Sequence, residues 1–130
     1  EMQRSLVGSE MCIRDRYTAG HDVKIATVAC GYADGYPRAL SNCGEILVNG
    51  VRCPIVGRVC MDQFMCDVTN AEVKPGDVVT LIGEDGGEAI TSDDIAQLTG
   101  TIGYEIVCGI SERVPRAAFL GGKLVGAYKL

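Results

Sequence analysis

The sequence predicts a mainly β fold, either a barrel or a sandwich, with one or two short helices. Seventeen glycines in 130 residues, no tryptophan and only two phenylalanines are typical of short strands joined by tight turns. Valine- and isoleucine-rich runs alternate with these turns along the chain. No internal repeat or linker divides it, so the length predicts one domain or a piece of a larger protein.

The clearest local signal is Asn49-Gly50 between two apolar runs, which predicts a two-residue hairpin because both turn positions require positive φ. Pro54 lacks an N–H group, so we expect it at a sheet edge or a bulge. Period-two patterning predicts strands at 24–30, 45–48, 51–56, 64–68 and 78–83.

One helix is predicted after the acidic turn at 84–88. Thr91 or Ser92 caps it, acidic residues follow in its first turn, and Gly100 ends it. Residues 102–110 fit either a second helix or a strand. The last strands are expected at 114–120 and, after a Gly-Gly turn, at 123–130.

Charge and cysteine usage exclude several classes of protein. A net charge of −5 argues against nucleic-acid binding, and no apolar run is long enough to cross a membrane. The seven cysteines form no C-x-x-C pair and His21 is the single histidine, so the pattern argues against a zinc site. We expect Cys30, Cys53 and Cys66 to be small buried hydrophobes of a cytoplasmic protein rather than parts of a disulfide framework.

Residues 1–16 stand apart from the rest of the chain. Ser5 to Arg16 shows neither a helical nor a strand period, and it resembles a translated transposase adaptor of the kind used to prepare sequencing libraries. We therefore expect residues 1–16 to be artefactual or disordered, and residues 17–130 to form the domain. The alternative is a genuine, irregular N-terminal arm.

Two loops are dense in polar and special residues, and each follows a predicted strand. They are Gly31–Arg38, GYADGYPR, and Gly57–Gln63, GRVCMDQ. Binding groups concentrate on loops that a rigid scaffold positions. The plainer alternatives are a turn whose tyrosines cover the barrel end, and a bulge with a surface ion pair between Arg58 and Asp62.

These two motifs, followed by PGD-x-VTLIG and Ile-Ser-x-Arg-Val-Pro-Arg, resemble the C-terminal domain of bacterial alanine racemase. The resemblance runs from Tyr17 to about Leu120. It implies a small closed β-barrel within a homodimeric isomerase that depends on pyridoxal phosphate. That enzyme interconverts L- and D-alanine for peptidoglycan synthesis, and its own N-terminal (β/α)₈ barrel binds the cofactor through a lysine.

The resemblance also assigns roles to individual residues. Met61 matches a position whose backbone N–H meets the substrate carboxylate, and Tyr32 matches a tyrosine that narrows the substrate entryway. The matching positions along the entryway are Arg58, Asp62 and Ile110.

Two departures from the family pattern stand out. Glu112 occupies a position where the family has a tyrosine that bonds the cofactor phosphate, and a carboxylate would repel phosphate. The family's catalytic tyrosine, the second of two bases, falls on Ile13, which has no ionisable proton. We expect the chain alone to be inactive and to bind no cofactor.

Two alternatives to an alanine racemase stay open. One is that the parent protein is a serine/alanine racemase, of which this chain is part of the racemase domain. The other is that the chain is a non-enzymatic β-barrel binding module with an ordered N-terminal arm. The racemase hypotheses predict an exposed docking face that includes Tyr32, Tyr36 and Met61.

Overall fold

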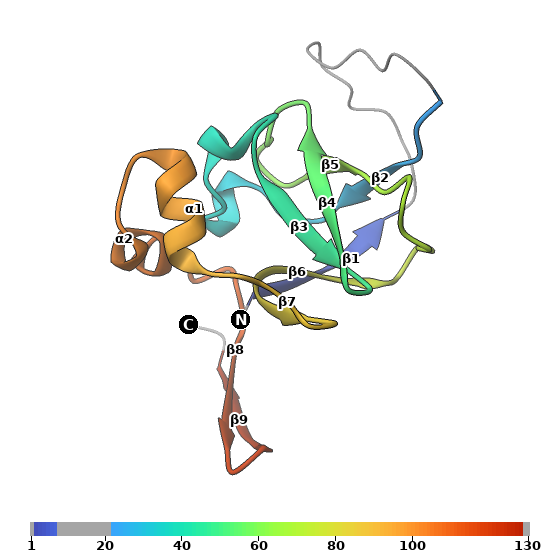
Figure 1. Cartoon of the computed structure of the whole chain (residues 1–130). Helices are drawn as coiled ribbons and strands as arrows, with labels where there is room; N and C mark the ends of the chain where they lie inside the picture. Colours follow the sequence, from blue (N-terminus) through green and yellow to red (C-terminus); the bar gives the residue numbers. More distant parts are fainter. Residues whose placement is uncertain (1, 8–21, 129–130) are drawn as a thin grey trace.

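The structure is a computed structural model that describes residues 2–7 and 22–128. It is mainly β, with two short α-helices on one side of the strands (Figure 1). The strands are β1 Met2–Val7, β2 Ile25–Val28, β3 Glu45–Val48, β4 Val51–Val56, β5 Phe64–Asp67, β6 Val78–Asp85, β7 Glu88–Ile90, β8 Arg116–Leu120 and β9 Lys123–Tyr128. The helices are η1 Tyr32–Asp34 and η2 Arg38–Leu40, both 3-10, and α1 Ser92–Thr99 and α2 Gly103–Cys108.

The main sheet curls back on itself as a small barrel. Its strands pair in the order β1-β2-β5-β4-β3-β6-β7, and β1 also pairs with β6. All these pairings are antiparallel, as expected for strands joined by short connections. The predicted barrel is therefore confirmed.

Apolar side chains of strands β2 to β7 and of helices α1 and α2 fill one core. Tyr36 and Phe64 stack within it, with ring centroids 5.0 Å apart. The prediction that Cys30, Cys53 and Cys66 are small buried hydrophobes is confirmed, and the six described cysteines carry free thiols.

Most predicted strands occur where the pattern placed them. The Asn49-Gly50 hairpin is confirmed, with φ of 49° and 78° at the two turn residues. Strand β4 as a whole lies between β3 and β5, but Pro54 pairs with β3 alone and so lies at a locally open edge, as predicted. Proline is tolerated there because the pairing with β5 covers only Ile55 and Val56.

Helix α1 begins and ends at the predicted capping residues. The Thr91 hydroxyl accepts a hydrogen bond from the Asp94 N–H at 3.1 Å, and Gly100 ends the helix at φ 76°. Residues 103–108, which fitted either structure, form helix α2. Strand β7 was not predicted, because three residues are too few to show a period.

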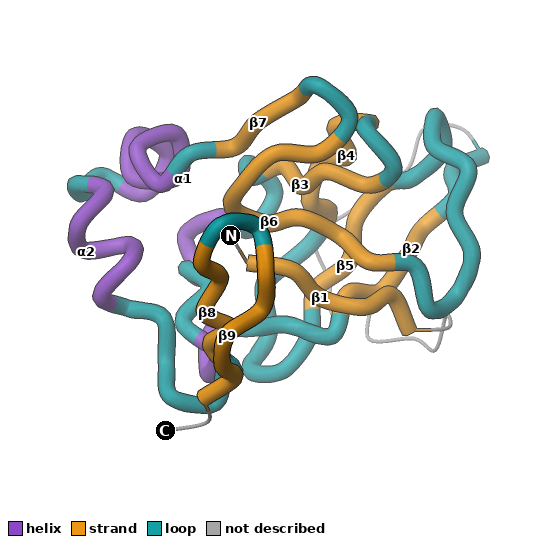
Figure 2. The backbone as a smooth tube through the Cα atoms, turned by 90° about the horizontal axis from the view of Figure 1, so that it is seen from below, coloured by secondary structure: helices purple, strands orange, loops and turns teal. Residues whose placement is uncertain are grey.

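The last two strands leave the barrel. β8 and β9 form a separate two-stranded hairpin, which projects away from the other strands (Figures 1 and 2). Its exposed apolar side chains include Phe119, Leu120 and Leu124.

The N-terminal prediction has a mixed outcome. Met2–Val7, expected to lack regular structure, forms β1, because the free edges of β2 and β6 supply backbone partners whatever its side-chain pattern. Residues 8–16 lie outside the described part of the chain. The adaptor origin of residues 1–16 stays a prediction.

Within the described residues, no helix is long and apolar enough to cross a membrane. No group of three or more His, Cys, Asp or Glu side chains in that same part of the chain could hold a metal ion.

Candidate functional site

Three segments far apart in the sequence meet at one end of the barrel: 31–36, 58–63 and 109–116. We call them the loop cluster. The first two are joined by main-chain hydrogen bonds, since the N–H groups of Tyr32 and Ala33 donate to the carbonyls of Cys60 and Met61, each at 3.0 Å. The two loops singled out in the sequence are thus one structure.

Two glycines allow this close approach. A Cβ atom on Gly31 would lie 2.2 Å from the Cys60 carbonyl oxygen, and one on Gly35 would lie 2.1 Å from the Gly109 carbonyl oxygen. Gly35 also adopts φ of 98°, which favours glycine. The first loop is therefore held between the other two segments at backbone contact.

Asp34 links the first and third segments. Its carboxylate accepts a hydrogen bond from the Gly31 N–H at 3.0 Å, and its carbonyl accepts one from the Ser111 N–H at 3.0 Å. Asp34 is buried, so these bonds are made away from competing water. The turn is consequently a rigid platform for Tyr32.

The backbone N–H of Met61 is free to bind a ligand. No cis peptide bond occurs among the described residues, so the Met61 N–H points opposite to the Cys60 carbonyl. That carbonyl faces Tyr32, and the N–H therefore faces away from the first loop. Among the described residues none accepts a hydrogen bond from it.

Asp62 is paired, but not with the residue that the sequence suggested. Its carboxylate accepts a hydrogen bond from Arg113 at 2.7 Å, rather than from Arg58. This bond holds the pKa of Arg113 above its usual value. The sequence motif contains Arg113, but nothing in it shows a contact across 51 positions.

Arg116 is the second residue that sequence reasoning missed. Its guanidinium donates to the carbonyls of Ile110, Ser111 and Val114 at 2.9–3.0 Å. It thereby holds the third segment in shape.

The predicted site residues are mostly accessible. Tyr32 is 48% exposed and Met61 53% exposed, as expected for an entryway surface. The prediction for Tyr36 was wrong, because its side chain is 1% exposed and stacks on Phe64 in the core. The other predicted positions are exposed, or half-buried for Ile110: Arg58, Asp62, Ile110 and Glu112. Ile13 lies outside the described residues.

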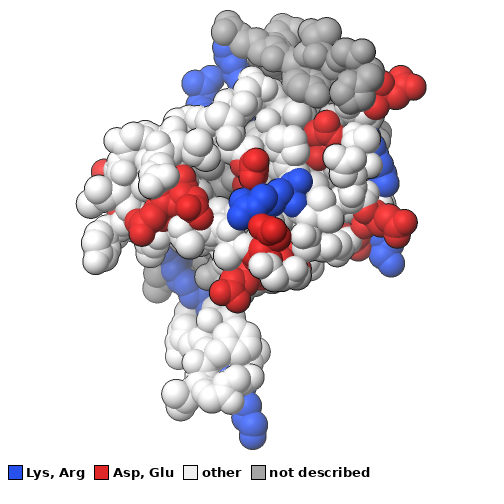
Figure 3. All heavy atoms as spheres, viewed as in Figure 1, with Lys and Arg blue, Asp and Glu red and all other residues white. Residues whose placement is uncertain are grey.

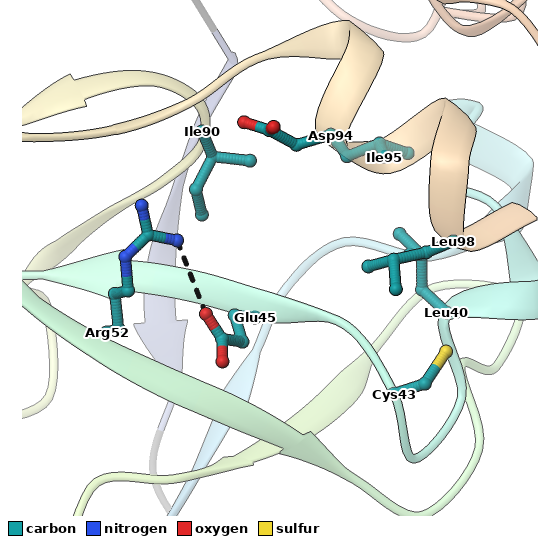
Figure 4. Close-up of a pocket in the computed structure, with 8 residues that line it drawn as sticks. All are labelled: Leu40, Cys43, Glu45, Arg52, Ile90, Asp94, Ile95 and Leu98. Carbon is teal, nitrogen blue, oxygen red and sulfur yellow. Dashed lines mark hydrogen bonds and ion pairs between the residues drawn. The ribbon is translucent and has the colours of Figure 1, made fainter.

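A cavity of about 240 Å³ lies elsewhere, between α1 and strands β3 and β4 (Figure 4). It shares no lining residue with the loop cluster. Arg52 at its edge is bound by Glu45 and Glu88, and acidic and basic side chains lie side by side on the face shown in Figure 3. That face carries no extended basic patch among the described residues.

The described residues do not fit pyridoxal phosphate. The three described lysines, Lys24, Lys74 and Lys123, are exposed and lie outside the loop cluster. Glu112 presents a carboxylate on the third segment, which opposes a phosphate. What the cluster does offer is a main-chain donor, suited to a carboxylate.

Comparison with known proteins identifies the family of the chain. Residues 3–118 match the family described as "Alanine racemase, C-terminal domain". The chain belongs to this family. The resemblance seen in the sequence is therefore confirmed.

Whole alanine racemases are among the relatives of this C-terminal domain. It is 59% identical to alanine racemase from Halothermothrix orenii over 101 residues, which are 77% of this chain and 27% of the relative. It is 56% identical to alanine racemase from Symbiobacterium thermophilum over 108 residues, which are 82% and 28%.

Solved structures show the same fold. Alanine racemase from Bacillus anthracis with bound L-Ala-P matches 98% of this chain and 33% of its own, with a TM-score of 0.85 and 45% identity. Alanine racemase from Bartonella henselae with covalently bound pyridoxal phosphate matches 86% and 29%, with a TM-score of 0.69 and 33% identity. The chain thus spans about a third or less of the racemases it matches.

Proposed function

We propose that this alanine racemase C-terminal domain forms the substrate entryway of a racemase that interconverts L- and D-alanine. The observation that supports this most directly is the unpaired Met61 N–H in a loop cluster that also carries the exposed Tyr32, in a domain whose relatives are alanine racemases. A main-chain donor binds the carboxylate that all amino acids share. The tyrosine ring limits the width of the approach.

The remaining machinery would come from outside this chain. The lysine that holds pyridoxal phosphate, the (β/α)₈ barrel around it and the second subunit of a homodimer belong to the proposed parent enzyme. When bound, pyridoxal phosphate would supply an electron sink for the α-carbon of the substrate. Residues of this chain bind the carboxylate and shape the entryway. With Ile13 at the position of the tyrosine base, the chain supplies neither base.

The test is a chimera. The preceding part of the Halothermothrix orenii enzyme, up to the residue before the one that matches Tyr17, is joined to residues 17–130 of this chain. We expect the purified chimera to bind pyridoxal phosphate and to racemise L-alanine. A folded chimera that loads cofactor but shows no racemisation contradicts the proposal.

A second chimera serves as the matched control. It retains residues 8–16 of this chain, so that isoleucine replaces the catalytic tyrosine. Its activity should be lost, and Ile13→Tyr should restore part of it. Turnover of L-serine against L-alanine separates an alanine racemase from a serine/alanine racemase.

The non-enzymatic binding module makes the opposite prediction. A module of that kind would stay inactive in the first chimera and would not associate with a separately expressed N-terminal part. Sedimentation of the two parts together measures that association.

A further inference from the structure

One guanidinium group joins a buried and an exposed carboxylate in the loop cluster. Arg113 Nη2 donates to Asp62 Oδ1 at 2.7 Å, and Arg113 Nε lies 3.7 Å from Asp34 Oδ1. The side chain of Asp34 is 7% exposed, whereas that of Asp62 is 61% exposed. Arg113 therefore connects a buried carboxylate to an exposed one.

The buried end of this chain of contacts is held by the main chain. The second oxygen of the Asp34 carboxylate accepts the Gly31 N–H at 3.0 Å. The Asp34 carbonyl binds the Ser111 N–H, two residues before Arg113. Because main-chain hydrogen bonds fix both the Asp34 carboxylate and the backbone at Ser111, Arg113 has a defined position from which to bind Asp62.

The position of Asp62 matters for an anionic ligand. Asp62 follows Met61, whose N–H is the free donor of the site. An unpaired carboxylate next to this donor would repel a substrate carboxylate. An ion pair with Arg113 offsets that repulsion, while no described residue occupies the Met61 N–H.

We propose that Arg113 is a positioning residue that neutralises Asp62, anchors it to Asp34, and so lets the Met61 N–H donate a hydrogen bond to an amino-acid carboxylate. This inference rests on the proposed function. It assigns to Arg113 and Asp34 a role in substrate affinity rather than in the chemical step.

The test uses the active chimera with Arg113→Gln. We expect KM for L-alanine to rise about two- to fivefold at low salt, as the loss of an exposed ion pair implies, with kcat almost unchanged. The increase should shrink at high salt, because salt screens exposed charges. Arg113→Lys, which keeps the charge, should retain most of the affinity.

The double variant Arg113→Gln with Asp62→Asn decides between charge and packing. If the charge on Asp62 is the cause, the double variant recovers the KM of the unsubstituted chimera. Failure to recover, or a loss confined to kcat, overturns the proposal. The matched control is Arg52→Gln, which breaks similarly exposed ion pairs with Glu45 and Glu88, both outside the loop cluster, and should leave KM unchanged.

A measurement on the 130-residue chain itself separates this inference from the proposed function. In ¹H–¹⁵N spectra, Arg113→Gln should shift the Met61 and Asp62 amide signals, and Arg52→Gln should not. If the unsubstituted chimera is inactive while these shifts occur, the proposed function fails and the positioning contact stands. Unchanged amide signals overturn the positioning contact.

Discussion

Gly31 lies where the loop cluster leaves no room for a side chain. A methyl group there would meet the Cys60 and Met61 carbonyl oxygens at 2.2 and 2.3 Å, and both are backbone atoms that cannot rotate away. We expect Gly31→Ala to lower the free energy of unfolding by about 2–3 kcal/mol, as overpacking does. Gly57→Ala is the control: it has open space around it and costs only the strain of φ 75°, about 1 kcal/mol. Thermal melts compare the two, and equal losses would contradict the close contact.

The hydroxyl of Tyr36 is buried and has no hydrogen-bond partner among the described residues. Burying an unpaired polar group is costly, so Tyr36→Phe should raise the free energy of unfolding by about 1–2 kcal/mol. Tyr104→Phe, at an exposed position, should change nothing. Urea titration measures both variants. A destabilised Tyr36→Phe would show that the hydroxyl has a partner.

Two core cysteines predict how stability depends on pH. Burial raises the pKa of the Cys53 thiol to about 11 and that of Cys66 to about 12. Folding therefore disfavours both thiolates, and this contribution to stability is complete below the ordinary thiol pKa. It is lost as pH rises from about 9 toward 12. Urea unfolding at pH 7.5 and pH 10.5 should show the loss, and a Cys53→Ala, Cys66→Ala variant should show a smaller one.

The sequence predicted which residues lie in the loop cluster more accurately than it predicted which residues they bind. Tyr32 and Met61 stand in motifs that can be read locally, and both are exposed at the cluster. The Arg113–Asp62 pair was missed because it joins segments 51 positions apart. Tyr36 was misplaced because a tyrosine in a turn motif carries no sign of which way its ring packs.

Among the elements, those with their own stop signals were predicted most closely. The Asn49-Gly50 turn fixed both ends of its hairpin, and Thr91 and Gly100 bounded α1. β1 was missed because its pairing comes from the edges of β2 and β6, which its own residues do not reveal. Tertiary pairing thus decided what local pattern could not.

The β8–β9 hairpin is the element least supported by this chain. It pairs with no other described strand, and a lone two-stranded hairpin is only marginally stable in water. Ending the chain at Ala118 keeps Arg116, which holds the third segment of the loop cluster. We expect this truncation to leave the melting temperature of the barrel within a few degrees while reducing dye binding to exposed apolar surface. A large drop in melting temperature would show that the hairpin supports the barrel.

At the scale of the molecule, closure of the barrel depends on one strand. β1 pairs with β2 through Leu6 and Val7 and with β6 through 2–5, so it fills the gap between two edges that would otherwise be open. Open strand edges invite pairing between molecules. A chain that begins at Tyr17 should therefore melt at a lower temperature and self-associate at high concentration.

The control for that deletion keeps the chain length and replaces Met2–Val7 with a glycine-serine segment. If β1 closes the barrel, this variant should have the lower melting temperature and the self-association of the deletion. The preceding part of the chimera can supply a strand of its own, so we expect the chimera not to self-associate through an open edge. Light scattering and thermal melts distinguish the three proteins. Equal melting temperatures for the full chain and the deletion would show that β1 contributes nothing to stability, as expected if residues 1–16 are adaptor-derived and unrelated to the barrel. A lower melting temperature for the deletion would show that the pairing of β1 with β2 and β6 stabilises the barrel.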